Sequence, residues 1–264
     1  MTEALNLIAI NFKTYDLIDR FLDSLRRFPP RCETTLTIID NATDRAKLAA
    51  LDVSGLPVEV HKIPVAANLG YARACNLGAL LGEGRYVALL NSDTRFTNPD
   101  CLDRMVEFMD AKPECAVAGP LQVDDAGMVT HAGIFGSHAA PQMRAFHHPM
   151  RPEYRLDSRC ITVSGSAYFV RRTVWDEMTA CPIFMACSPY AMGAFLHTEH
   201  YFEESWLSWH VHGHGYEVWY VGSAEMEHLW HKSSPEDDPR DVGLFQRSRE
   251  TFRFACTKHD LLHD

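Results

Sequence analysis

Short β-rich runs alternate with helical patterns along the first half of the chain. The run LNLIAINF, from Leu5, is typical of a buried strand, and apolar residues then recur at a helical period over Tyr15 to Phe28, before two prolines. The alternation repeats with strands predicted at TLTIID, PVEVHKI and YVALL, and helices expected near Thr43, after Gly70 and at Pro99. Strands that alternate with helices predict a mostly parallel sheet with helices on both faces.

Each of these four predicted strands runs into a polar loop. Parallel strands present their carboxyl ends at one edge of a sheet, and ligands of open α/β sheets bind at that edge. The loops therefore predict a binding site built from IIDNAT, NLGYAR and LLNSDT.

The pattern changes after Pro113. VAGPLQVDDAGMVTHAGIFG indicates a hairpin with its turn at Asp-Asp-Ala-Gly, and the segment 136–157, rich in Pro, His and Arg, is interpreted as a mobile loop. ITVSGSAYFVRR and EVWYVG have strand character, the stretch 198–212 looks helical, and a charged linker and a helix are expected after Ser233.

Composition narrows the class of protein. A chain of 264 residues with 46% hydrophobic residues can bury the core of one domain, and no apolar run approaches the roughly 20 residues that span a bilayer. The net charge of −10 argues against nucleic acid as the main ligand, because phosphate binding relies on Lys and Arg. The eight cysteines form no C-x-x-C pair, and the first residues lack a signal-peptide pattern, so reduced thiols and a cytoplasmic location are expected.

Asp93, in LLNSDT, is the first candidate for chemistry. Its carboxylate would lie at the carboxyl edge of the sheet, where a divalent cation could bridge it to phosphates. Taken alone, the same residue also suits a turn or a helix N-cap.

Seven segments in order resemble glycosyltransferase family 2, with its rhamnosyltransferase-like branch the most similar. They cover about residues 5 to 234 and read INFKT, IIDNAT, NLGYARACNLG, YVALLNSDT, VSGSAYFVRR, YFEESW and AEMEHLWHKS. The resemblance implies the GT-A fold, a nucleotide-linked sugar donor (UDP-, dTDP- or GDP-linked) and inversion at the anomeric carbon. The acceptor stays unidentified.

The resemblance also assigns the donor side. Ile10 and Asn11 would floor the nucleotide pocket, and Asp40 would hydrogen-bond the base. The alternative for Asp40 is a turn that caps the next helix. The other donor-side residues implied by the family motifs are Asn68, Gly70, Arg73, Asn76, Asn91 and Ser92.

A metal site follows from the same comparison. Asn91 replaces the first acid of the family's D-x-D-like motif, which leaves Asp93 as the carboxylate for the metal. His228 matches a later histidine that completes coordination, and His231 could assist or substitute. Imidazole ligation favours Mn²⁺ over Mg²⁺.

Inverting transfer needs a base beside the acceptor hydroxyl. YFEESW resembles the family's F-E-D segment and places Glu204 where an Asp usually serves. Glu is one methylene longer, so Glu203 stays a second candidate, and both acids could instead stabilise the start of a helix. Ser164 and Gly165 resemble a turn on the acceptor side.

Aromatic and histidine clusters in the second half are open to two interpretations. Trp206 and its neighbours could stack on a sugar, although packing in the core accounts for each of them. In HVHGHG, the first two histidines fall on different helix faces and no cysteine or acid pattern accompanies them, so an exposed helix end is expected rather than a zinc site. The 136–157 loop contains four basic residues that could fold over the diphosphate or hold an acidic acceptor. They are Arg144, His147, His148 and Arg151.

The resulting prediction is one GT-A domain over 1–234, with a nucleotide half to 119, an acceptor half from 120, and a linker and helix over 235–264. Two rivals are considered. A nucleotidyltransferase should have a Gly-rich loop after the first strand, which NFKTYD lacks, and a catalytically silent binding module is supported by the Asn91 and Glu204 departures. The oligomeric state is open, since the tail could pack within one chain or between subunits.

Overall fold

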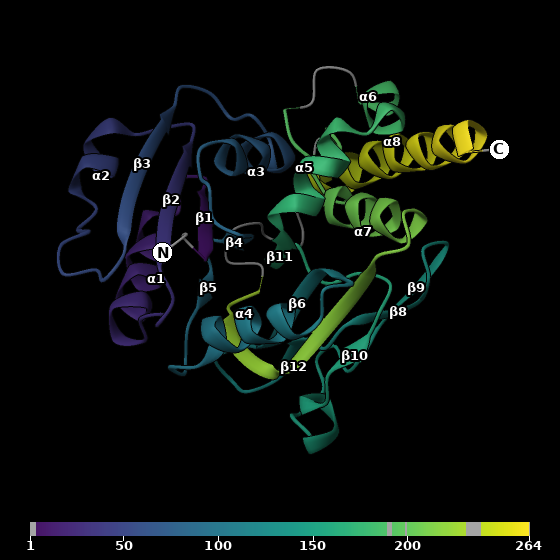
Figure 1. Ribbon diagram of the computed structural model, residues 1–264. Helices are drawn as coiled ribbons and strands as arrows, with labels where there is room; N and C mark the ends of the chain where they lie inside the picture. The colour runs from purple at the N-terminus through teal and green to yellow at the C-terminus, as the bar shows by residue number, and fades with distance from the viewer. Residues whose placement is uncertain (1–3, 189–191, 199, 231–238, 264) are drawn as a thin grey trace.

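The computed structural model describes residues 4–188, 192–198, 200–230 and 239–263. Helices and strands alternate over its first half, as the periodicity predicts (Figure 1). The elements of this half are β1 (Leu5–Asn11), α1 (Tyr15–Arg27), β2 (Thr34–Asn41), α2 (Arg45–Ala50), β3 (Glu59–Val65), α3 (Tyr71–Leu80), β4 (Tyr86–Asn91), β5 (Thr94–Arg95) and α4 (Cys101–Ala111).

The second half mixes hairpins, helices and one long strand. Its elements are β6 (Cys115–Val123), β7 (Val129–His131), β8 (Ile134–Ser137), β9 (Ala140–Met143), the 3₁₀ turn η1 (Pro152–Arg155), β10 (Ser158–Arg159), β11 (Ala167–Arg171), α5 (Arg172–Ala180), α6 (Pro182–Cys187), α7 (Glu203–Gly213), β12 (Glu217–His228) and α8 (Pro239–His263).

The central sheet has the order β10-β12-β6-β11-β4-β1-β2-β3. The strands β4, β1, β2 and β3 are parallel neighbours, so their carboxyl ends do meet at one edge. Strand β11 runs antiparallel between β4 and β6, and β12 lies parallel to β6. The predicted fold class, a mostly parallel sheet with an antiparallel portion in the second half, is confirmed.

Alternate side chains of β1 point to opposite faces of the sheet, as the two-residue period of a strand requires. Leu5, Leu7 and Ala9 join one apolar core with residues of α1 and α4, whereas Ile8 and Ile10 join a second core with residues of α3, α5 and α7. Helices therefore cover both faces (Figure 1).

A third apolar cluster lies apart from the sheet, among α6, α7 and α8. It includes Phe184, Trp206, Phe252 and Ala255. The C-terminal helix α8 packs along α7 at this helical end (Figure 1).

Several local predictions need correction. The helix near Thr43 begins at Arg45 and is capped by Asp44, whose side chain accepts hydrogen bonds from two backbone amides. The 136–157 segment is not a structureless loop, because the hairpin β8–β9 and the turn η1 fall within or across it. The predicted helix over 198–212 begins only at Glu203.

The described residues contain no helix that is long and apolar enough to cross a membrane. All eight cysteines are free thiols.

Candidate active site

The first site residues lie where β1 and β2 end side by side. Asp40 is fully buried, and its Oδ1 accepts a hydrogen bond of 2.7 Å from Asn11 Nδ2 while its Oδ2 accepts one of 2.8 Å from the Tyr15 hydroxyl. Tyr15 also accepts a bond from the backbone amide of Asp44. Asp40 thus joins β1, β2 and the start of α1, and its proposed contact with a base stays a prediction.

A second polar group links β2 to the start of α3. The amide of Asn41 donates to Asn68 Oδ1 at 2.8 Å, and that oxygen also accepts from the amide of Gly70 at 2.9 Å. Gly70 has a φ of 81°, which favours glycine, and it directly precedes α3. Arg73, in the first turn of α3, is exposed. Side-chain hydrogen bonds therefore hold the loop before α3, and the Arg73 side chain beside it faces solvent.

Asn76 is the donor-side candidate that the structure places inside the protein. It is 1% exposed, donates to the carbonyl of Phe195 at 3.0 Å and accepts from the Phe195 amide at 3.1 Å. These two bonds fix the segment that precedes α7 against α3. Asn76 therefore bonds α3 to the segment before α7 and has almost no surface left for a ligand.

Strand β4 delivers Asn91, Ser92 and Asp93 to the same edge. Ser92 is buried and its hydroxyl lies 2.8 Å from that of Thr14, while the Asn91 amide donates to the carbonyl of Ser166. These contacts tie the NSD segment to the loop after β1 on one side and to the 164–166 turn on the other.

Asp93 and His228 lie side by side, although they are 135 positions apart in the sequence (228 − 93). Their adjacency follows from the antiparallel pairing of β5 with the end of β12, in which Thr94 lies opposite His228 and the Leu229 amide donates to the Asp93 carbonyl. The Asp93 Oδ1 and His228 Nε2 atoms are 3.4 Å apart, and both side chains are buried. His231 lies outside the described residues.

The pair fits a divalent cation. Two adjacent ligand atoms of an octahedral ion with bonds of about 2.1 Å are on the order of 3 Å apart, close to the separation here. His228 Nε2 and the Asp93 carboxylate face each other, so these are the two candidate ligand groups. The other ring nitrogen of His228, Nδ1, is buried and has no hydrogen-bond partner among the described residues. A carboxylate with an imidazole suits Mn²⁺ and similar ions.

The 164–166 turn lies on the other side of this edge. The Ser164 hydroxyl is 2.8 Å from that of Ser166, which donates to Gln122 Oε1 at 2.7 Å. The Gly165 carbonyl accepts a bond of 2.6 Å from the hydroxyl of Tyr71, the first residue of α3. The predicted acceptor turn is therefore braced from both β6 and α3.

His131 was missed by sequence reasoning. It is 1% exposed, and its Nε2 atom accepts bonds of 3.3 Å from the amides of Gly133 and Ser164. Burial, together with smaller contributions from the nearby His228 and Arg144, lowers the pKa of His131 to about 3, so His131 is neutral. No sequence signal marked it, because the contact with Ser164 joins two distant segments.

Glu204 faces this turn from the start of α7. Its carboxyl atoms are 3.7 Å from the position that a side chain at Gly165 would occupy. Burial, and after it the charge of Glu203, raises the pKa of Glu204 to about 8. Glu203 is 3% exposed and accepts a bond of 2.8 Å from the Thr198 hydroxyl, and burial also raises its pKa. Of the two acids, Glu204 lies against the acceptor turn.

The segment after β9 packs against Trp230, a neighbour of His228. The ring of Phe146 packs 4.8 Å from that of Trp230, centroid to centroid, and Trp230 lies 5.4 Å from His228. Arg144, by contrast, donates to the Ala132 carbonyl and stacks over Phe135 and Tyr220. The 136–157 segment therefore packs on Trp230, the ring that lies against His228, and Arg144 acts within the segment as a packing residue.

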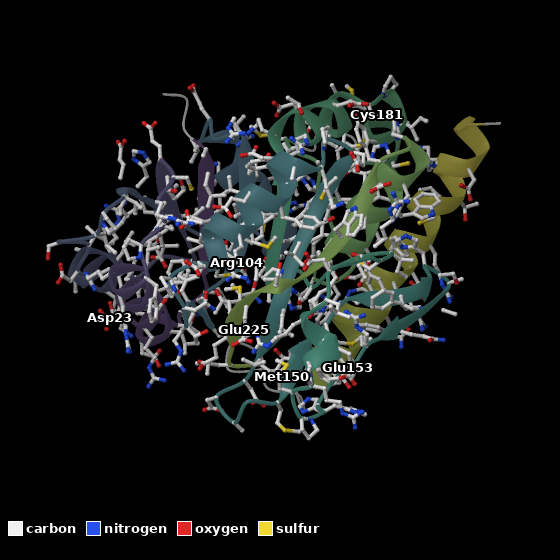
Figure 2. The ribbon with its side chains drawn as sticks, turned by 60° about the horizontal axis from the view of Figure 1, so that its bottom comes forward. Asp23, Arg104, Met150, Glu153, Cys181 and Glu225 are labelled. Carbon is white, nitrogen blue, oxygen red and sulfur yellow. The ribbon has the colours of Figure 1, made fainter. Side chains whose placement is uncertain are left out.

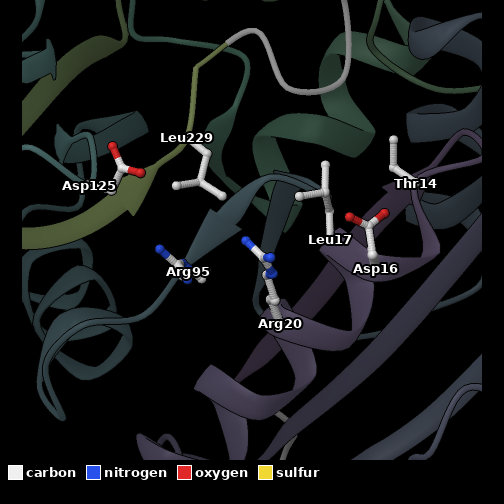
Figure 3. A pocket seen from close by; sticks show the side chains of 7 residues that line it. All are labelled: Thr14, Asp16, Leu17, Arg20, Arg95, Asp125 and Leu229. Carbon is white, nitrogen blue, oxygen red and sulfur yellow. The ribbon is translucent and has the colours of Figure 1, made fainter.

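A cavity of about 400 Å³ lies between α1 and Leu229, the residue after His228. Figure 3 shows Arg20 and Arg95 together on one side of it, with Leu229 facing them. The guanidinium of Arg95 is held by Glu227. The rest of the lining is Thr14, Asp16, Leu17 and Asp125.

Two predictions on the acceptor side are corrected. Trp206 is fully buried among Phe184, Trp209 and His259, so it has no face for a sugar and packs in the core of the helical end. His210 of HVHGHG is also fully buried, so that segment is not an exposed helix end. Both residues lie on the face of α7 that α6 and α8 cover, which periodicity alone did not reveal.

Comparison with known proteins agrees with this geometry. Residues 7–172 match the family model described as glycosyl transferase family 2. The chain is 26% identical, over 98% of its length and 86% of the relative's, to N-acetylglucosaminyl-diphospho-decaprenol L-rhamnosyltransferase of Mycobacterium tuberculosis, in two strains.

Solved structures share the fold. GalNAc-T7 with UDP, GalNAc and Mn²⁺ superposes with a TM-score of 0.63 at 12% identity, over 86% of this chain and 44% of that one. A mannosyltransferase from Pyrobaculum calidifontis in complex with GDP-Man and Mn²⁺ gives 0.61 at 13% identity, over 100% of this chain and 65% of that one. The chain thus spans less than two thirds of either structure. From its fold, its ordered motifs and the match over residues 7–172, the chain belongs to glycosyl transferase family 2 and is a glycosyltransferase that uses a nucleotide sugar.

Proposed function

We propose that this protein transfers a sugar, with inversion, from a nucleoside-diphosphate donor to an acceptor hydroxyl, with a divalent metal held by Asp93 and His228. The observation that carries the proposal is the 3.4 Å approach of these two side chains at the carboxyl edge of the sheet. Ligands of open α/β sheets bind at this edge.

The metal, when bound, neutralises charge on the leaving diphosphate. Residues of the chain bind the donor and move the proton. The braced loops after β1, β2 and β4 form the nucleotide floor, and Arg73 lies at the start of α3, where helix amide groups favour an anion. Holding such donors in place before the reaction is what makes electrostatic stabilisation effective.

Glu204 takes the proton of the acceptor hydroxyl in this proposal. Its carboxyl group lies beside Gly165. A general base works best when its pKa is near the pH at which the enzyme operates, and the pKa of Glu204 is about 8. Glu203, held by Thr198, then maintains the raised pKa of its neighbour and takes no proton from the acceptor.

The donor sugar is proposed to be a deoxyhexose of the L-rhamnose type. Support comes from the mycobacterial relative, which is named as an L-rhamnosyltransferase and aligns over 98% of the chain. The acceptor class proposed is a hydroxyl-bearing glycan or lipid-linked sugar, and Mn²⁺ is the preferred metal because a histidine joins the carboxylate.

Donor hydrolysis tests the function without knowledge of the acceptor. Purified protein is incubated with a panel of nucleotide sugars and Mn²⁺, Mg²⁺ or a chelator, and release of nucleoside diphosphate is measured. Release is expected with Mn²⁺ and one deoxyhexosyl donor, and Asp93→Ala should lower the rate by at least about 10²-fold, the cost of losing one group that stabilises developing charge.

Asp23→Ala is the matched control, since Asp23 is an exposed carboxylate on α1 that pairs with Arg26. Activity of Asp93→Ala at the control level would refute the metal assignment. Donor binding without release of nucleoside diphosphate under any metal would instead identify a silent binding module.

A further inference from the structure

A second set of metal-ligating side chains lies at the helical end of the molecule. Cys181, at the junction of α5 and α6, meets His210 and His214 at the C-terminal end of α7, the end opposite Glu204. One ligand atom from each of the three residues lies within 4.8 Å of the others. Figure 2 places Cys181 among these helices, far from Asp23 on α1.

The backbone explains why the three meet. His210 lies in the last turn of α7 and His214 directly follows the helix, four residues on, so the turn brings the two rings close together. Cys181 stands between two helices, directly before Pro182, and is buried there. The segment HVHGHG alone did not predict this cluster, because Cys181 lies in a different part of the sequence.

The imidazole of His214 is oriented as a metal ligand would be. Its Nδ1 atom lies 3.0 Å from the carbonyl of His210, which can only accept, so Nδ1 carries the hydrogen. In the neutral ring the Nε2 atom then has a lone pair, and it lies 3.8 Å from Cys181 Sγ. Metal-bound histidines commonly have their other nitrogen fixed by a carbonyl in this way.

The separation of Cys181 Sγ and His214 Nε2, 3.8 Å, is close to that of two ligands on one tetrahedral ion. With Zn–S of about 2.3 Å and Zn–N of about 2.0–2.1 Å, a sulfur and a nitrogen on the same zinc are about 3.6 Å apart. A thiol–imidazole hydrogen bond alone would account for Cys181 and His214. That bond involves only two of the three residues, whereas a ring nitrogen of His210 also lies within 4.8 Å of both ligand atoms.

We propose that Cys181, His210 and His214 form a zinc site with three protein ligands, separate from the pair of Asp93 and His228. A thiolate with two imidazoles selects Zn²⁺ over Mn²⁺ or Mg²⁺, which prefer oxygen ligands. Water completes the tetrahedron, since the three residues supply three donors.

The site would fasten together the helices that carry the acceptor half. His210 stacks on Phe184 of α6, and the ring of His259, from α8, packs 5.2 Å from that of His210. Zinc would thus tie the α5–α6 junction to α7 directly and support the packing of α8 on top of it.

Metal analysis tests the proposal on the full chain, purified on a non-metal affinity tag. After incubation with Zn²⁺ and dialysis, elemental analysis should find about one zinc per chain, and Co²⁺ loading should give a thiolate-to-cobalt charge-transfer absorption band. In Cys181→Ser this band should vanish, and Cys181→Ser and His214→Gln should bind zinc at least about 100-fold more weakly, because loss of even an outer-shell partner costs about 10–100-fold.

Two controls lie nearby without joining the cluster. Cys187→Ser removes a thiol that bonds to the Ala255 carbonyl, and His212→Gln removes the imidazole on the other face of α7, near the Ile161 carbonyl. Both should keep the zinc and the cobalt band. Asp93→Ala should also keep them, which separates this site from the proposed active site.

Wild-type protein that takes up no zinc and shows no thiolate–cobalt band would overturn the proposal, even if the variants fail to fold. Equal zinc binding by Cys181→Ser and wild type would overturn it as well.

Discussion

Asp40 near the end of β2 and Glu204 at the start of α7 are both carboxyl groups set into the protein, but their surroundings differ. Both oxygens of Asp40 accept hydrogen bonds, from Asn11 and Tyr15. Glu204 instead lies beside a second carboxyl group, Glu203, and burial raises its pKa to about 8. A buried carboxylate with a full set of donors suits a scaffold, whereas one with a raised pKa suits proton transfer.

The largest expected effect separates the two acids of α7. Glu204→Gln should lower kcat for donor hydrolysis by about 10²–10⁴-fold, the range for loss of a general base, and Glu203→Gln should lower it much less. In the wild type, kcat should rise as pH increases through about 8, because Glu204 must lose its proton to act. Rates over pH 6 to 10 check this, and equal losses in both variants would contradict the assignment.

Removing Trp206 should affect stability and leave donor binding unchanged. Trp206→Ala should lower the free energy of unfolding by about 3–5 kcal/mol, because a large buried ring leaves a cavity. Denaturant titration measures this, and donor affinity is compared in parallel under conditions where the variant is folded. A specific loss of sugar binding in a stable variant would restore the stacking interpretation.

The donor-side scaffold is tested by Tyr15→Phe. The change removes the hydroxyl that donates to Asp40 and accepts from the Asp44 amide, and it should cost about 1–3 kcal/mol of unfolding free energy. Tyr216→Phe is the control, because its hydroxyl bonds to Glu177 on the exposed surface. Similar losses in the two variants would show that Asp40 is no scaffold.

Glu204 should also make stability depend on pH. The folded chain holds its proton more tightly than the unfolded chain does, so stability falls as pH rises from the ordinary glutamate range through about 8. Glu204→Gln should therefore raise Tm by a few degrees at pH 8.5 and leave it nearly unchanged at pH 4. Thermal melts at the two pH values decide, and a gain of equal size at both would point to a cause other than ionisation.

The smallest effect is expected at Gly165. A methyl group there would lie 3.7 Å from Glu204, an ordinary contact, so Gly165→Ala should change unfolding free energy by less than about 1 kcal/mol. Gly119→Ala is the contrast, since its methyl would lie 2.6 Å from Val163. A large loss of stability in Gly165→Ala would show that the turn is more tightly packed than its contacts indicate.

The local sequence pattern predicted the secondary structure of the first half of this protein. Strand and helix periods predicted β1 to β4 with their helices, because apolar residues recur at two or about 3.6 positions wherever an element buries one face. The motifs around Asp93, His228 and Glu204 pointed to the family, which the match over residues 7–172 confirms.

Only the tertiary structure decided which distant residues meet. The placement of β11 between β4 and β6, the pairing of β5 with β12, and the convergence of Cys181 with His210 and His214 each join segments that are far apart in the chain. Burial of Trp206 and the raised pKa of Glu204 depend likewise on which helices cover α7. Periodicity reports which side of an element is apolar, but contact between elements depends on the packing of the whole chain, which no local pattern contains.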